Sequence, residues 1–256
     1  MSMLIDWKSR EIFSSLRVPE DSMVILRLDG WRFSDLALSL GLDKPYDRRF
    51  AETMVRATSK LFELGMPINL AYTFSDEISL LLNPPLPWRG RVEKMNSVIP
   101  SLVSSFISNE LRRNDIAFDS RVVFITGASD AIDYLSWRQE EAWRNHINSY
   151  ALYALEKEGI TGKKADEMLR GMKSHEKHEL VFKKLGINLA ETPAWQRRGI
   201  LIRWEEFEKK GFDPIEGKEV IVKRRKIVQD WEPPIFSSEE GRRYLIKALG
   251  INEKKF

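Results

Sequence analysis

Two aspartates stand where apolar segments typical of β-strands come to an end. Asp29 follows residues 24–28, Val-Ile-Leu-Arg-Leu, and Asp76 lies in Phe-Ser-Asp-Glu-Ile, residues 74–78. If these segments are neighbours in one sheet, the two carboxylates lie close together and repel each other unless a divalent cation lies between them. Mg²⁺ prefers hard oxygen ligands of this kind, completed by phosphate oxygens. The pair therefore predicts nucleotidyl or phosphoryl transfer assisted by metal ions.

Each aspartate also has a purely structural interpretation. The sequences Asp-Gly and Ser-Asp are turn signals, because short polar side chains satisfy nearby backbone donors. Glu77 follows Asp76 and is either a third acid of the site or a residue at the edge of a strand. Gly30 follows Asp29 and would let the backbone approach a phosphate or offer its carbonyl oxygen to a metal. From these residues alone, both interpretations stay open.

Cationic and polar side chains would have to hold the phosphates of a nucleotide at such a site. The candidates in this chain are Lys44, Arg91, Arg121 and Lys177, together with His146 and Asn148 on a long helix. Taken singly, each of them is more simply explained as a solvated surface residue or a polar margin of a helix.

The elements that must position these residues begin in the order β-α-β-β-α-β, which is typical of ferredoxin-like folds. In the first strand, period-two alternation places Ile25 and Arg27 on the same face as Asp29, and the apolar residues between them on the other face. The remaining elements of this half are a helix from Asp43 to about 64, strands at 68–74 and 77–83 joined by a Ser-Asp turn, a helix at 90–113 and a strand at 121–125.

The second half is mostly helical. Its expected elements are helices at 130–158, 161–171 and 174–185, a hairpin of 200–204 with 220–228, and a short charged C-terminal helix. The fold class is therefore α+β. Residues 1–135 would form a ferredoxin-like, palm-type antiparallel sheet with helices on one face, and residues 136–256 a helical extension with a small β-hairpin, packed on the palm as one structural unit. Many proteins without catalysis share this fold, so it does not decide the function.

Composition limits the class of protein further. The 256 residues are 43% hydrophobic and 31% charged, as in ordinary soluble globular proteins. No apolar run approaches the roughly 18 residues needed to cross a bilayer, and charges near the N-terminus argue against a secretory signal. The absence of cysteine excludes disulfides and fits a reducing cytoplasm. The three histidines lack a zinc-like spacing, which leaves carboxylates as metal ligands.

The net charge of +3 points weakly to a polyanionic partner. Basic residues gather at 223–226 and 112–113, whereas the acids are scattered. Such clusters are equally consistent with solvated faces.

Several motifs follow one another in the chain. They are Arg-Leu-Asp-Gly-Trp-Arg-Phe at 27–33, Phe-Ser-Asp-Glu-Ile-Ser at 74–79, Phe-Asp-Ser-Arg-Val-Val at 118–123, Asp-Tyr-Leu-Ser-Trp-Arg-Gln at 133–139, His-Ile-Asn at 146–148, Lys-His-Glu-Leu-Val-Phe at 177–182 and Gly-Ile-Asn at 186–188. In this order they resemble the tRNA-histidine guanylyltransferase family and its guanylyltransferase-like relatives. The resemblance runs from about residue 4 to 230, nearly the whole folded chain.

The resemblance implies a palm-like catalytic domain, related to polymerases, that extends tRNA at its 5′ end in the reverse, 3′–5′ direction. Enzymes of this kind activate a 5′-monophosphorylated tRNA with ATP, or use an existing 5′-triphosphate, and the 3′-hydroxyl of GTP then attacks the activated end. By similarity, Asp29 and Asp76 would hold two Mg²⁺ ions together with the carbonyl of Gly30. Glu77 would be a further catalytic acid close by, and the protein would be a homotetramer.

The resemblance also assigns residues to the phosphates and to the branch of the family. The positions that hold a triphosphate or the activated end are matched by Lys44, Ser75, Arg121 and Lys177, by Arg91 in a proline-rich loop that differs from the family's, and by His146 and Asn148 in the helix motif. Eukaryotic members continue this motif as His-Ile-Asn-Asn-Leu-Tyr-Asn, whereas Leu152 stands at the last position here. The difference favours the archaeal and bacterial branch, which adds nucleotides by Watson–Crick templating and repairs truncated 5′ ends.

Two other functions stay open. A palm-type nucleotide cyclase shares the arrangement of two carboxylates on a strand and a hairpin, although the hairpin here lacks a Gly-Gly-Asp-Glu-Phe signature. A non-catalytic RNA-binding module would rely on the basic clusters and bind RNA with a steep salt dependence. A cyclic product from GTP alone would identify the cyclase.

Overall fold

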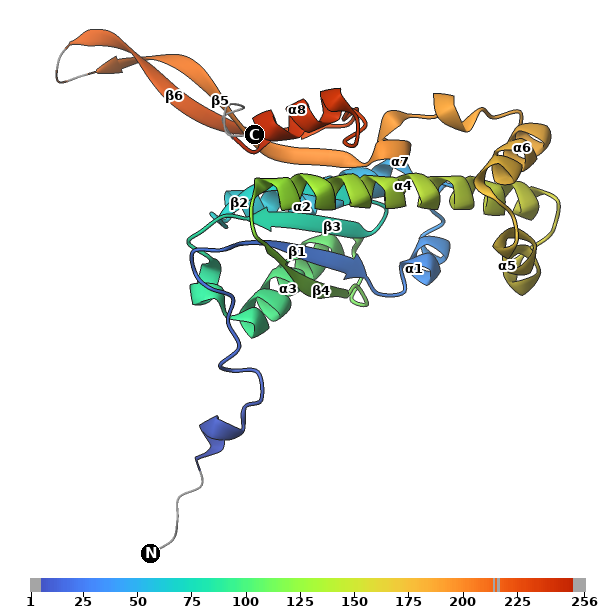
Figure 1. Ribbon diagram of the computed structural model, residues 1–256, viewed down its shortest axis with the longest axis horizontal. Helices are drawn as coiled ribbons and strands as arrows, with labels where there is room; N and C mark the ends of the chain where they lie inside the picture. Colours follow the sequence, from blue (N-terminus) through green and yellow to red (C-terminus); the bar gives the residue numbers. More distant parts are fainter. Residues whose placement is uncertain (1–5, 214, 216, 251–256) are drawn as a thin grey trace, which may run out of the picture.

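The computed structural model describes residues 6–213, 215 and 217–250 (Figure 1). Its centre is a six-stranded antiparallel sheet in the order β4-β1-β3-β2-β5-β6. The strands are β1 Met23–Gly30, β2 Ile68–Phe74, β3 Glu77–Leu82, β4 Phe118–Ile125, β5 Ile200–Asp213 and β6 Lys218–Asp230. The first four strands, with α2 Arg48–Glu63 and α3 Val92–Leu111, follow the predicted β-α-β-β-α-β order. The predicted α+β class is therefore confirmed.

Alternation along β1 decides which helices cover each face of the sheet. Val24, Leu26 and Leu28 are buried in one core with side chains of α2 and α3. Ile25 points to the other face, where it packs with α4 Ala128–Lys157 and α8 Glu239–Ala248. The helices of the palm thus cover one face, as predicted, and helices of the C-terminal half cover the other (Figure 1). Each fully buried side chain of this kind contributes roughly 1.5–3 kcal/mol by leaving water.

The helix α4 extends beyond the sheet, and shorter helices pack around its far end (Figure 1). These are α5 Gly162–Arg170 and α6 Ser174–Leu185, whereas α7 Ala194–Arg198 lies beside the middle of α4, near Gln139 and Tyr150. A separate core joins Ile147 and Leu155 of α4 to Leu169 of α5 and Val181 of α6. A helix of 30 residues spans about 45 Å, so α4 links this core to the sheet.

Some boundaries differ from the sequence-based expectations. The helix expected from Asp43 begins at Arg48. Asp47 caps it by accepting hydrogen bonds from the backbone amides of Arg49 and Phe50. The short helix α1 Phe33–Ser39 was not expected, and β4 begins three residues earlier than expected. Residue 135 lies within α4, and the division of the chain into two domains there stays a prediction.

The predicted small hairpin is a long one. Its strands β5 and β6 have 14 and 13 residues and extend well away from the rest of the molecule (Figure 1). Near the body, residues 200–203 of β5 pair with β2, so the hairpin continues the sheet of the palm. Within the described part of the chain, no helix combines the length and the apolar character needed to cross a membrane.

One contact at the end of β1 requires glycine. A Cβ atom at Gly30 would lie 2.3 Å from the ring of Phe33 at the start of α1. That ring is buried against Phe50 and Phe118, with ring centroids 5.7 and 5.0 Å away. The chain can therefore turn back on the strand end only because position 30 has no side chain.

We expect Gly30→Ala to lower the free energy of unfolding by about 1–3 kcal/mol, the usual cost of adding atoms to a packed core. Gly171→Ala is the matched control, because nothing lies within 4 Å of the added methyl group and φ there is −89°. Urea unfolding of both variants measures the difference. Equal stabilities would show that the ring of Phe33 moves aside without cost.

Candidate active site

Acidic side chains meet at one end of the sheet. Asp29, near the end of β1, lies directly opposite Glu77 of β3 and Asp119 of β4. Because alternate residues of a strand share a face, Asp29 points to the same side as Ile25, the side that α4 covers. The three acids therefore form a row across three neighbouring strands.

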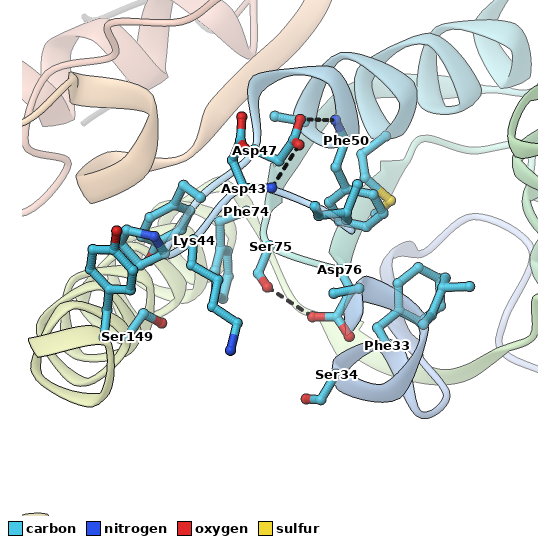
Figure 2. Close-up of a pocket in the computed structure, with 18 of the residues that line it drawn as sticks. Phe33, Ser34, Asp43, Lys44, Asp47, Phe50, Phe74, Ser75, Asp76 and Ser149 are labelled. Carbon is cyan, nitrogen blue, oxygen red and sulfur yellow. Dashed lines mark hydrogen bonds between the residues drawn. The ribbon is translucent and has the colours of Figure 1, made fainter. Parts of the chain in front are cut away.

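Asp76 adjoins this row in the tight turn between β2 and β3. Ser75 and Asp76 are the two central residues of the turn, and Ser75 has a φ of 50°. This left-handed conformation costs a non-glycine residue about 1–2 kcal/mol. The Ser75 hydroxyl donates a hydrogen bond of 3.0 Å to Oδ1 of Asp76, which fixes the carboxylate (Figure 2).

The structure brings the charges of Asp29 and Asp76 together. Burial raises the pKa of Asp76, and the negative charge of Asp29 raises it further. Both effects oppose ionisation, and the repulsion from Asp29 disappears when a cation neutralises the pair.

Glu77 has a different environment from its neighbours. It is buried, and Arg138 of α4 donates two hydrogen bonds to its oxygens, at 2.8 and 2.5 Å. Burial raises the pKa of Glu77, and the hydrogen bonds and charge of Arg138 oppose this shift. Both carboxylate oxygens are thus engaged by Arg138, a residue to which the sequence assigned no role.

The carboxylates that remain, those of Asp29 and Asp76, fit Mg²⁺ better than a metal ion whose ligands all come from the protein. In the part of the chain that the structure describes, no group of three or more histidine or acidic side chains could hold an ion. Mg²⁺ at nucleotide sites needs only one or two carboxylates, and it completes its shell with phosphate oxygens and water. Asp29 and Asp76 offer such carboxylates, and burial makes the charge of Asp76 costly without a cation.

A cavity of about 400 Å³ adjoins Asp76. Its walls come from α1, residues 42–47, the β2–β3 turn and α4 (Figure 2). Ser75 and Lys44 line it together with Asp76. The Lys44 ammonium group lies 2.7 and 2.8 Å from the two carboxylate oxygens of Glu156, so this predicted phosphate ligand is paired with an acid of α4. Volumes of this size suit a nucleotide-sized ligand.

Arg121 lies on the same face as the acidic row. It faces Arg27 across β1 and β4, two residues along each strand from Asp29 and Asp119. Two residues of a strand span about 7 Å, so both guanidinium groups are within reach of a phosphate at the carboxylates. Within the described part of the chain, Arg121 has a single ion contact, at 4.0 Å to Asp119.

The predicted residues of the helical half lie elsewhere. The Lys177 ammonium group donates to Oδ1 of Asn148 at 2.7 Å, and the cavity lining includes neither residue among those described. His146 is fully buried and stacks between Tyr46 and Trp143, with ring centroids 5.5 and 5.4 Å away.

His146 is therefore not a ligand for an incoming nucleotide in this arrangement. Its Nε2 atom lies 3.0 Å from the hydroxyl of Thr192, and its Nδ1 atom has no hydrogen-bond partner among the described residues. Burial lowers its pKa to about 4, so the ring is neutral at pH 7. Because Tyr46 lines the cavity, His146 supports the cavity wall from behind.

Arg91 lies far from the carboxylates. The strand β3 begins beside Asp29 and ends opposite Val24, and Arg91 follows nine residues later, directly before α3. The helix has 20 residues and spans about 30 Å back to the acidic end of the sheet. Within one chain, the structure does not bring Arg91 to the other predicted site residues.

The antiparallel β-α-β-β-α-β sheet, with paired aspartates at neighbouring strand ends beside a cavity, defines a palm-type domain. Residues 6–126 match the family model described as tRNAHis guanylyltransferase, and residues 129–234 match the model described as Thg1 C terminal domain. The chain belongs to the tRNA(His) guanylyltransferase family.

Relatives and solved structures agree with this assignment. A tRNA(His) guanylyltransferase of Schizosaccharomyces pombe is 31% identical over 210 residues, 76% of this chain and 80% of the relative. A probable tRNA(His) guanylyltransferase of Mus musculus is 29% identical over 195 residues, 72% of this chain, but the match spans only 65% of the mouse protein, just under two thirds of its length. A bacterial tRNA(HIS) guanylyltransferase (Thg1)-like protein in complex with GTP has a TM-score of 0.68 and 26% identity, covering 95% of this chain and 96% of its own. A similarly described protein in complex with ATP has a TM-score of 0.74 at 24% identity, covering 96% and 98%, and shares the fold.

The raised pKa of Asp76 predicts the sign of a pH effect on stability. In the unfolded chain an aspartate titrates near pH 3.9, and in the folded protein the pKa of Asp76 is higher. The wild-type protein therefore loses stability as pH rises from about 4 through that higher pKa. We expect Asp76→Asn to unfold at a higher temperature than the wild type at pH 7 without metal, and the difference to vanish below about pH 4.

Asp130 provides a control, because its replacement should change the unfolding temperature in the opposite direction. Two hydrogen bonds from Thr126 lower the pKa of Asp130, so Asp130→Asn should unfold at a lower temperature than the wild type at pH 7. Thermal unfolding of the three proteins from pH 3 to pH 8 measures both effects. An Asp76→Asn protein no more stable than the wild type at pH 7 would contradict the predicted cost of ionising Asp76.

Proposed function

We propose that this protein adds nucleotides, chiefly GMP from GTP, to the 5′ end of tRNA in the 3′–5′ direction, with a template strand. ATP would first activate 5′-monophosphate ends. The observation that carries this proposal is the coupling of Asp29 and Asp76 at the strand ends, beside a cavity that also presents Lys44. Membership of the family and the GTP complex of a bacterial relative support it.

The proposed reaction forms one phosphodiester bond. The 3′-hydroxyl oxygen of GTP attacks the 5′-phosphorus of the activated RNA, and the bond from that phosphorus to AMP, or to pyrophosphate in a triphosphate end, breaks. Asp29, Asp76 and the carbonyl of Gly30 would hold two Mg²⁺ ions. When bound, such ions lower the pKa of an attacking hydroxyl and neutralise the leaving group.

The chain's own residues would divide the remaining tasks. Lys44 would leave Glu156 to bind phosphate oxygens in the cavity, while Ser75 holds the carboxylate of Asp76 in place. Arg27 and Arg121 would hold the phosphate of the activated RNA end. Arg91, Asn148 and Lys177 lie outside this cluster, and a role for them in binding nucleotide rests on the family resemblance alone.

The position of Leu152 supports the proposal that the reaction is templated. Leu152, the residue that departs from the eukaryotic motif, lines the cavity. Its apolar side chain offers no hydrogen bond to a base, so recognition of the incoming base would fall to pairing with the opposite RNA strand. The resemblance also supports a homotetramer and a role in maturation or repair of tRNA 5′ ends as parts of this proposal, and the absence of cysteine supports a cytoplasmic location.

We expect Asp29→Ala and Asp76→Ala to lower kcat/KM for incorporation of GTP into 5′-activated tRNA by about 10²–10³ or more, because developing charge would lose its stabilisation. The control is Asp166→Ala, an exposed acid on α5. Incorporation of labelled GTP in the presence of Mg²⁺ measures the rate. An unchanged rate in either variant would refute the site, and a cyclic product from GTP alone would favour a cyclase.

The pairing of Lys44 with Glu156 predicts a gain of function. Glu156→Gln should lower KM for GTP by up to about fivefold, because exposed ion pairs are worth about 0–1 kcal/mol and Lys44 would no longer have to leave one. Lys44→Ala should raise the same KM. The matched control is Glu158→Gln, which removes a pair of similar exposure with Lys184. Equal effects of the two glutamate substitutions would show that Lys44 does not bind phosphate.

A further inference from the structure

Trp137 is an exposed aromatic side chain on α4, and 44% of it is accessible to solvent. This part of α4 lies directly over β3. The hydroxyls of Tyr134 and Ser79 are 3.2 Å apart, and Arg138 binds Glu77. Trp137 is therefore held close to the acidic end of the sheet.

The rotation of α4 determines where Trp137 points. Gln139 binds the carbonyl of Pro234 at 3.0 Å and the amide of Phe236 at 2.7 Å, on the side of the sheet where β5 and β6 lie. An α-helix turns about 100° per residue, which places Trp137 about 160° around the helix from Gln139. Trp137 therefore projects toward the opposite side, where β1 and β4 carry Asp29 and Arg121.

Neighbouring side chains hold the indole ring of Trp137 in one orientation. The Arg138 guanidinium lies 4.5 Å from the centroid of the indole, and the ring of Tyr134 meets it edge-on at 5.6 Å. Because Glu77 fixes this guanidinium in a buried pair, the cation–π contact also fixes the indole. A preorganised aromatic surface loses little conformational freedom when a ligand stacks on it.

The charges next to this surface are complementary to a nucleic acid. Arg27 and Arg121 are direct cross-strand neighbours, and like charges in such positions are destabilising. Among the described residues, the Arg27 side chain forms no hydrogen bond or ion pair, and the Arg121 side chain has only the 4.0 Å contact with Asp119. A phosphate between the two guanidinium groups would remove their repulsion.

We propose that Trp137 is the platform on which the 5′-terminal base of the RNA stacks, while Arg27 and Arg121 hold the phosphate of that nucleotide. The inference rests on the proposed function and names the residue that places the RNA end. Stacking is tolerant of base identity, which suits an enzyme that selects the incoming base through a template. Trp137 is not among the described residues that line the cavity, so it acts on the RNA and not on the incoming GTP.

Binding of a tRNA that lacks its first nucleotide and carries 2-aminopurine at the new 5′ end tests this assignment. Stacking on indole quenches the fluorescence of 2-aminopurine, and omitting nucleotides prevents any reaction. We expect quenching by the wild type and its loss in Trp137→Leu, with roughly 5- to 150-fold weaker RNA binding, the range for one stacked base. The KM for GTP should stay unchanged.

The matched control is Trp7→Leu. Trp7 is 67% exposed, and Arg10 lies 5.0 Å from its ring centroid, so it reproduces the exposed indole and its arginine away from the site. This variant should quench and bind RNA as the wild type does. If Trp137→Leu unfolds at a lower temperature, Trp137→Phe decides, because a smaller ring should keep most of the quenching and the affinity.

The remaining outcomes separate this inference from the proposed function. No quenching by the wild type, or wild-type quenching by Trp137→Leu, overturns the platform. A Trp137→Leu protein with lower kcat and unchanged RNA binding also overturns the platform, because it shows that Trp137 only supports Arg138. If the wild type quenches but incorporates no nucleotide into any activated tRNA, the platform stands and the proposed function fails.

Discussion

Repulsion between carboxylates at one end of the sheet is the constraint on which the rest of this structure depends. Glu77, Asp29 and Asp119 face one another across three strands, and Asp76 is next to them. Like charges at such positions are destabilising unless something offsets them. Arg138 offsets the charge of Glu77. The charges of Asp29 and Asp76 have no such partner among the described residues, so the repulsion between them is not offset.

The long helix α4 organises both sides of this site. At its first half, Arg138 binds Glu77, and Gln139 anchors the helix to the C-terminal segment. Two turns later, His146 packs against Tyr46 and so supports residues 42–47, the part of the cavity wall that carries Lys44. A shift of α4 would therefore change the acidic row and the side of the cavity that carries Lys44 together.

The local parts of the site could be predicted from the sequence. The alternation in β1 and the Ser-Asp turn depend on residues close in the chain, so their patterns place Asp29 and Asp76 at strand ends. Arg138 could not be found in this way, because its contact with Glu77 spans 61 residues. The burial of His146 was missed for the same reason, since a histidine on a helix gives no sign of the aromatic rings that will cover it.

The length of the hairpin was missed for a different physical reason. Residues 205–219 are mostly charged and polar, a pattern that resembles a loop. The strands persist because each acid of β5 faces a base of β6 across the ladder, as Glu205 faces Lys226 and Glu208 faces Lys223. Opposite charges in these positions contribute about 0.2–1 kcal/mol per pair.

The site also shows why the two halves of the chain depend on each other. The paired aspartates and the Ser-Asp turn come from the part that matches the first family model, whereas Arg138, Leu152 and Glu156 come from the part that matches the second. Without α4, Glu77 would lose both its partner Arg138 and the helix that buries it. Total stabilities of domains are only about 5–15 kcal/mol, and the face of the sheet that carries Ile25 would lose its cover as well. We infer that the first half alone would not hold the carboxylates in their present arrangement, so the boundary between the two matches does not divide the active site into independent units.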